Sequence, residues 1–240
     1  MQLRTHLLAA ALAVLMAAGP AAAHDSAHDS AHDGAHGETV SRPAADYVFA
    51  LPEPGTYSLP AIRPAAGGPV LDEHGRAHDL GGLVQGQVTV LAFIYTQCGD
   101  VCPTATLRLA QLHDLAARDA RVAARLRLAT MSFDPDNDTP DVMREHAEQW
   151  RGPAGTAPEW LFLTAPDAAS LAPIMAAYDQ TVGRKPDPND PTGALNHLLR
   201  VFLIDAGGTV RNIYSLDFLD PNLVLGDVRT LLMERAPGGS

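Results

Sequence analysis

Two cysteines, Cys98 and Cys102, are the residues of this 240-residue chain whose type and spacing are best suited to chemistry. Pro103 follows the second of them, and an apolar run over residues 88–95 precedes the first. A disulfide between the two would close a very short loop and would stabilise the fold little, because that stabilisation grows with loop size. Thiolates bind soft metal ions and attack disulfides. The pair therefore predicts metal binding or thiol–disulfide exchange.

The elements around the cysteines predict how they are placed. Residues 88–95 are apolar and rich in β-forming types, as expected of a strand buried on both faces. Residues 102–120 carry apolar side chains at helical spacing. We therefore expect Cys98 in the loop after a strand and Cys102 at or in the first helical turn, where a helix N-terminus favours the thiolate. The C-x-x-x-C spacing is one residue longer than the C-x-x-C of thioredoxin-type redox motifs, but it can still close a disulfide.

The rest of the chain alternates between strand and helix patterns. This alternation predicts a thioredoxin-like α/β fold, in which a central mixed sheet is flanked by helices and preceded by an N-terminal extension. Sites in such sheets lie beyond the carboxyl ends of strands, which is where Cys98 falls. The expected elements are a short strand at residues 47–50, a hairpin at 70–76, strands at 126–133, 160–164, 198–205 and 209–214, and helices at 140–150, 167–178 and 223–234.

The first 23 residues have the organisation of a secretory signal peptide, with Arg4, an apolar run over residues 7–18 and a small-residue cleavage site ending at Ala23. The apolar run is shorter than the roughly 20 residues of a membrane span. We expect an exported, periplasmic protein, with retention as an uncleaved membrane anchor as the alternative. The expected organisation is a signal peptide at 1–23, a His-rich disordered tail at 24–42 and a thioredoxin-like domain at 43–240 with its core at about 70–236.

Residues 24–36 of the tail carry a histidine at every fourth position, most of them followed by aspartate, and this stretch contains no apolar residue large enough to pack. Such a tract is either a secondary metal site or a solubilising tail. The formal net charge is −11 with a single lysine, which argues against nucleic acid and against bulk membrane binding. The four tail histidines are His24, His28, His32 and His36.

Three segments together resemble the SCO/SenC family of copper chaperones, which serve cytochrome c oxidase assembly. They are VTVLAFIYTQCGDVCPTAT at 88–106, SFDPDNDTPDVM at 132–143 and NHLLRVFLIDAGGTV at 196–210. The similarity extends over roughly residues 70–232. It implies that Cys98, Cys102 and His197 bind copper, as Cu(I), Cu(II) or both.

The third of these ligands depends mainly on the resemblance. His197 directly precedes the predicted strand at 198–205, where a neutral imidazole could complete a Cys2His set. A lone histidine in such a place is more often an ordinary surface or core residue. Two positions depart from the family pattern. One is Gln97, before the first cysteine; the other is Asn196, before the histidine, and at this second position the family often has Asp. Such an Asp could orient the imidazole, and Asn196 could accept the same hydrogen bond without charge.

The resemblance implies a metallochaperone that delivers copper to a cuproenzyme, with the binuclear copper centre of cytochrome c oxidase and its subunit II as the expected target. A second copper donor or a thiol reductase would be a further partner. One alternative is a thiol–disulfide oxidoreductase that acts on the cysteines of a copper-receiving partner. Another is a periplasmic copper sensor or storage protein that uses the His tail. For Asp134 and Asp138 we expect turn formation and helix capping.

Overall fold

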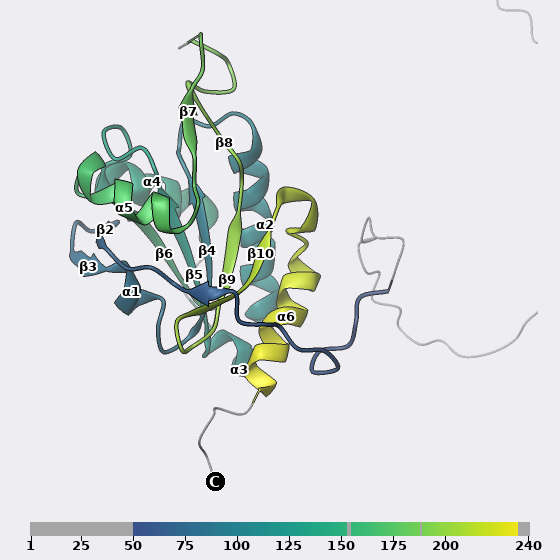
Figure 1. Ribbon diagram of the computed structural model, residues 1–240. Coiled ribbons are helices and arrows are strands. Elements are labelled where there is room, and N and C mark those ends of the chain that lie inside the picture. Colours follow the sequence, from purple (N-terminus) through teal and green to yellow (C-terminus); the bar gives the residue numbers. More distant parts are fainter. Residues whose placement is uncertain (1–49, 153–154, 188, 235–240) are drawn as a thin grey trace, which may run out of the picture. The chain divides into compact units, whose positions relative to one another are not determined.

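The structure, a computed structural model, describes residues 50–152, 155–187 and 189–234 (Figure 1). All of them belong to one compact unit, Ala45–Ser240. The predicted signal peptide, the His-rich tail and residues 47–49 of the predicted first strand lie outside the described residues. Within the described ranges, no helix is both long and apolar enough to cross a membrane.

The centre of the unit is an eight-stranded mixed sheet with the order β1-β10-β9-β4-β5-β6-β2-β3. Strands β4, β5 and β6 are parallel, while β9 joins β4 and β2 joins β6 in antiparallel pairs. The predicted mixed sheet is thus confirmed. The strands are β1 (Arg63–Pro64), β2 (Pro69–Asp72), β3 (Ala77–Asp79), β4 (Val88–Ile94), β5 (Leu126–Ser132), β6 (Glu159–Thr164), β9 (Val201–Ile204) and β10 (Thr209–Tyr214).

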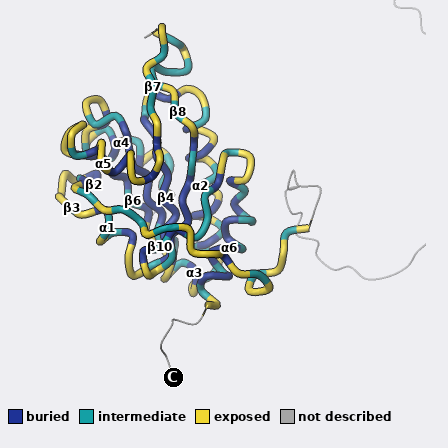
Figure 2. The backbone as a smooth tube through the Cα atoms, viewed as in Figure 1, coloured by how far each residue is buried: buried dark blue, intermediate teal, exposed yellow. Residues whose placement is uncertain are grey.

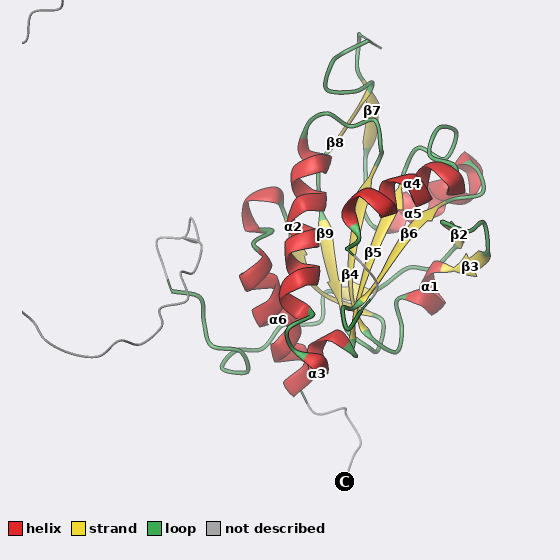
Figure 3. Ribbon diagram, turned by 180° about the vertical axis from the view of Figure 1, so that it is seen from behind, coloured by secondary structure: helices red, strands yellow, loops and turns green. Residues whose placement is uncertain are grey.

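Helices cover both faces of this sheet (Figure 3). Val90 and Ala92 of β4 pack in one core with α2, α4 and α6, whereas Leu91 and Phe93 pack in a second core with α1 and α5. All seven residues of β4 are therefore buried, which explains its unbroken apolar sequence (Figure 2). The helices are α1 (Leu80–Leu83), α2 (Val101–Ala116), α3 (Ala120–Ala123), α4 (Pro140–Trp150), α5 (Ala168–Ala177), α6 (Pro221–Met233) and the 3-10 turn η1 (Leu216–Phe218).

Two helix boundaries show how local capping decides where a helix begins or ends. Helix α4 begins as predicted, because the Thr139 side chain accepts a hydrogen bond from the Val142 amide and Pro140 occupies the first turn. Helix α2 ends at Ala116, earlier than the periodicity predicts. Asp119 there accepts hydrogen bonds from two following amides and so starts the separate helix α3.

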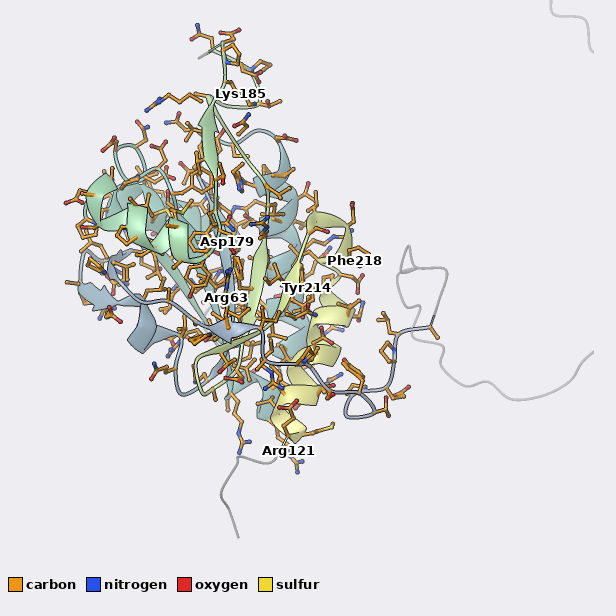
Figure 4. All side chains as sticks on the ribbon, in the orientation of Figure 1. Arg63, Arg121, Asp179, Lys185, Tyr214 and Phe218 are labelled. Atoms are coloured by element: carbon orange, nitrogen blue, oxygen red, sulfur yellow. The ribbon has the colours of Figure 1, made fainter. Side chains whose placement is uncertain are left out.

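The sequence missed a two-stranded sheet in which β7 (Val182–Arg184) pairs with β8 (Leu195–His197). We call residues 182–197 the arm; it extends beyond the end of the main sheet (Figure 1), and Lys185 marks its position in Figure 4. The strand predicted from residue 198 begins only at Val201. His197 is consequently the last residue of a strand in the arm rather than the residue that leads into a strand of the main sheet.

Candidate metal centre

The two cysteines lie where the sequence predicts. Cys98 is in the loop after β4, and its amide donates a hydrogen bond to the Tyr95 carbonyl at 3.3 Å. Cys102 is the second residue of α2. Both thiols are free, and the residues are only 8% and 3% exposed, respectively. The pair is therefore shielded, but Cys98 retains a small opening to solvent.

The environment makes the two thiols unequal. A hydrogen bond from the Cys102 side chain lowers the pKa of Cys98 to about 6, assisted by the Asp100 and Cys102 amides and opposed by burial. The same hydrogen bond and the deeper burial of Cys102 raise its pKa well above the usual thiol range. Cys98 is therefore a thiolate at neutral pH, while Cys102 is the protonated partner that stabilises it.

His197 reaches this pair from the arm. Its Nε2 lies 3.5 Å from the Sγ of Cys102, although the two residues are 95 positions apart in the chain. Burial lowers the pKa of His197, against smaller opposing effects of the Leu198 backbone and Asp100, so the imidazole is neutral at pH 7. A neutral imidazole offers a nitrogen lone pair, which is the form that binds metals.

The contact between sulfur and nitrogen fits two ligands of one metal ion. Metal–sulfur and metal–nitrogen bonds of about 2.3 and 2.0 Å place tetrahedral ligand atoms roughly 3.5 Å apart. Across the described residues, however, no three His, Cys, Asp or Glu side chains form a ready metal-binding group. Cys102 is the shared neighbour of Cys98 and His197, so a three-ligand site would need the side chains to adjust around it.

Comparison with known proteins gives the family. A family model described as SCO1/SenC matches residues 71–233. The chain belongs to the SCO1/SenC family. Among its relatives, the SCO1 protein homolog of Bacillus subtilis is 25% identical over 132 residues, which cover 55% of this chain and 64% of the relative. The SCO2-like protein of Rickettsia felis is 23% identical over 149 residues, covering 62% of this chain and 67% of the relative.

Solved structures of SCO proteins share the fold. The Arabidopsis thaliana ScoI structure with copper bound matches with a TM-score of 0.60 at 17% identity, covering 70% of this chain and 97% of the other. The Bradyrhizobium japonicum ScoI structure with copper bound matches with a TM-score of 0.57 at 22% identity, covering 69% and 97%. These likenesses confirm the predicted thioredoxin-like fold.

The structure corrects the expectation for Asn196 in this SCO1/SenC domain. A Cβ atom on Gly183 would lie 2.5 Å from the Asn196 Oδ1, so the amide lies against β7. Successive side chains of a strand point to opposite faces, which carries Asn196 away from His197. The Nδ1 of His197 is buried, and no group in the described ranges forms a hydrogen bond with it. Residue 196 therefore does not orient the imidazole.

Asp138 has a role that the sequence did not reveal. Its fully buried carboxylate accepts hydrogen bonds from the Thr96 amide at 3.0 Å, the Thr96 hydroxyl at 2.5 Å and the Ser132 hydroxyl at 2.5 Å. It thereby ties the cysteine loop to the end of β5. Asp134 forms the turn, as predicted, while the helix-capping role expected for Asp138 belongs to Thr139. The acidic residue was visible in the sequence, but its partner 42 positions away was not.

Proposed function

We propose that this protein is a copper metallochaperone that binds one copper ion through Cys98, Cys102 and His197. The observation that carries the proposal is the 3.5 Å contact between the Cys102 sulfur and the His197 nitrogen, beside the Cys98 thiolate. The copper-bound ScoI structures of Arabidopsis thaliana and Bradyrhizobium japonicum support it, since this chain shares their fold.

The donor set suits copper in both oxidation states. Two thiolates satisfy soft Cu(I), and an added imidazole provides the nitrogen that Cu(II) favours. Binding deprotonates Cys102, because a thiol binds a metal as its thiolate. A set of only three ligands, of which Cys98 retains a small opening to solvent, would allow a partner to replace the ligands one at a time. Copper is thus the cargo of the protein.

The proposed setting is the periplasm, with residues 1–23 as the export signal. The proposed recipient is a copper-accepting protein such as subunit II of cytochrome c oxidase, which would receive copper for its binuclear centre. A solved structure of BsSco, described as a member of the Sco family of cytochrome c oxidase assembly proteins, supports this direction; it matches with a TM-score of 0.57 at 18% identity. The histidines of the tail are proposed as a secondary copper site.

Metal analysis tests the copper site directly. The chain is prepared with His24, His28, His32 and His36 replaced by alanine, so that only the folded unit is measured. We expect one tightly bound Cu(I) per chain, and its loss in Cys98→Ala and in Cys102→Ala. His197→Ala should retain Cu(I) but lose most of its Cu(II) affinity.

His146→Ala is the matched control, because His146 is also partly buried and leaves a ring nitrogen without a hydrogen bond among the described residues. It should bind copper like the unaltered chain. Full copper binding in Cys98→Ala would defeat the proposal. Restoring the four tail histidines should add copper beyond one equivalent, and an unchanged stoichiometry would remove the tail from the proposal.

Thiol–disulfide exchange is a second candidate, favoured by the pairing of a thiolate with a protonated thiol. The Cys98 thiolate would attack a partner disulfide, forming a mixed disulfide and releasing one partner thiolate. Cys102 would then lose its proton and attack the Cys98 sulfur, releasing the second partner thiolate. Two electrons pass to the partner, and a Cys98–Cys102 disulfide remains. Turnover with a disulfide-containing partner peptide, absent in Cys98→Ala, supports this function; no exchange with any such peptide excludes it.

A further inference from the structure

Tyr95 contacts both halves of the candidate metal centre. It follows β4 directly, three residues before Cys98, and is only 2% exposed. Its carbonyl accepts the hydrogen bond of the Cys98 amide at 3.3 Å. Its hydroxyl donates to the Leu195 carbonyl at 2.9 Å, and the Leu195 amide lies 3.4 Å from the same oxygen. One residue thus joins the cysteine loop to the strand that carries His197.

The arm depends on such contacts for its position. Among the described residues, strand β8 pairs only with β7 in a separate two-stranded sheet, and no hydrogen-bond ladder there joins it to the main sheet. Apart from the Tyr95 hydroxyl, the Gly99 amide holds the arm by donating to the Thr192 carbonyl at 3.1 Å. An isolated two-stranded sheet is marginally stable in water. Val182 and Leu195 of the arm also pack against the core that contains Cys98 and Cys102. These contacts together hold β8, and with it His197, near Cys102.

The backbone of the arm is shaped around the tyrosine. Gly193 has φ +96°, and a Cβ atom there would lie 2.1 Å from the Tyr95 hydroxyl oxygen. The Tyr95 ring also packs against Phe133 at 5.3 Å between centroids, and the Phe133 and His197 rings meet edge-to-face with centroids 4.5 Å apart. Tyr95 thus acts on His197 in two ways: its hydroxyl is bonded to Leu195, two residues before His197, and its ring packs on Phe133, which in turn contacts the His197 ring.

We propose that Tyr95 is a positioning residue that holds His197 within reach of the two cysteines and so determines whether copper takes a third ligand. This inference rests on the proposed function, in which His197 is that ligand. Cu(I) is satisfied by two thiolates, whereas Cu(II) gains from the imidazole. The Tyr95 hydroxyl therefore acts on Cu(II) and has little effect on Cu(I).

Tyr95→Phe removes the hydroxyl and keeps the ring. With the four tail histidines replaced by alanine, we expect Cu(II) affinity to fall about fivefold, the equilibrium factor of one typical hydrogen bond. Cu(I) affinity should change less than twofold. The electron paramagnetic resonance spectrum of bound Cu(II) should lose nitrogen coupling and shift toward that of His197→Ala.

Tyr178→Phe is the matched control. Tyr178 is 1% exposed and lies in the same core, and its hydroxyl donates to the Ala66 carbonyl at 3.1 Å, away from the arm. It should lose a similar amount of thermal stability and keep the Cu(II) spectrum of the unaltered chain. If Tyr95→Phe and Tyr178→Phe have the same Cu(II) affinity and spectrum while His197→Ala binds Cu(II) weakly, the positioning role of Tyr95 is refuted and His197 remains the third ligand. If His197→Ala also binds Cu(II) normally, the ligand assignment under the proposed function fails as well.

Discussion

At the scale of single residues, the chemistry of the site begins with an asymmetric pair of thiols. Cys98 has a pKa lowered to about 6, and the pKa of Cys102 is raised. One sulfur is thus ready to bind or attack at neutral pH, while the other reacts only after it loses a proton. Under the proposed function, Cys98 would be the first ligand to copper and Cys102 the second, and in disulfide exchange the two would act in the same order.

The asymmetry predicts the pH dependence of alkylation. Only the thiolate reacts, so the rate rises as Cys98 deprotonates and should reach half its plateau near pH 6. Free thiols reach theirs at about 8.5. We expect a single modified cysteine at pH 7, identified by mass spectrometry of the iodoacetamide-treated apo protein. Cys102→Ser replaces the thiol that stabilises the Cys98 thiolate, so the pH at which alkylation reaches half its plateau should change. If that pH were near 8.5 in the unaltered chain, the lowered pKa of Cys98 would be contradicted.

A second prediction concerns the buried carboxylate of Asp138. Asp138→Ala leaves three hydrogen-bond donors of Thr96 and Ser132 without their acceptor. Ser132 is fully buried and Thr96 is half-buried. A buried group left without its partner costs about 1–3 kcal/mol, so we expect the free energy of unfolding to fall by about 2–3 kcal/mol. Urea unfolding measures the change. Asp136→Ala, an exposed change in the same turn, should stay within about 0.5 kcal/mol, and equal losses in the two variants would show that the network is unimportant.

At the scale of elements, the arm is what completes the site, and Gly193 lets it approach. Gly193→Ala adds a methyl group against the Tyr95 hydroxyl and also strains a backbone at φ +96°. Backbone strain alone costs about 1–2 kcal/mol. We expect a larger loss of stability than this and a weakened Cu(II) affinity, measured by denaturation and by metal titration.

Gly75→Ala separates the two effects. Gly75 has φ +74° in the turn between β2 and β3, and nothing lies within 4 Å of the added Cβ atom. Gly75→Ala should lower the free energy of unfolding through backbone strain without changing copper binding. Equal effects of both substitutions would mean that the contact with Tyr95 contributes nothing.

The elements also show what the sequence could reveal. The apolar run over β4 and the helical periodicity of α2 predicted the places of Cys98 and Cys102. The prediction was correct because the side chains that are apolar in the sequence are also the ones buried in these two elements. The sequence pattern did not predict the arm. Strands β7 and β8 have only three residues each, which is too short to show a strand periodicity. The contacts of Tyr95 and Asp138 are made with residues 100 and 42 positions away, and no local pattern encodes such a distance.

At the scale of the whole molecule, Asp227 joins three distant segments. This buried carboxylate in α6 accepts hydrogen bonds from the Tyr57 hydroxyl at 2.6 Å, the Tyr214 hydroxyl at 2.7 Å and the Asn212 amide at 2.9 Å. Tyr57 precedes the first strand, and Tyr214 ends β10. The segment before the sheet, the sheet and the last helix are therefore fastened at one point.

Asp227→Ala should destabilise the molecule without disturbing the candidate metal centre. We expect a loss of about 3 kcal/mol in the free energy of unfolding, because the Tyr214 hydroxyl stays buried without its acceptor. Copper stoichiometry and the Cu(II) spectrum should be unchanged. Calorimetry and metal titration test this. Asp114→Ala, on an exposed side chain of α2, serves as the neutral control; altered copper binding in Asp227→Ala would show that the two regions are coupled.

The two edges of the main sheet have a consequence for how the molecule meets other chains. At one edge β1 has two residues, and Pro64 offers no backbone N–H. At the other edge β3 has three residues and leads directly into α1, whose first turn is capped by Asp79. Such short borders give an incoming strand little backbone with which to pair. The main sheet is therefore protected against edge-to-edge aggregation at both of these edges.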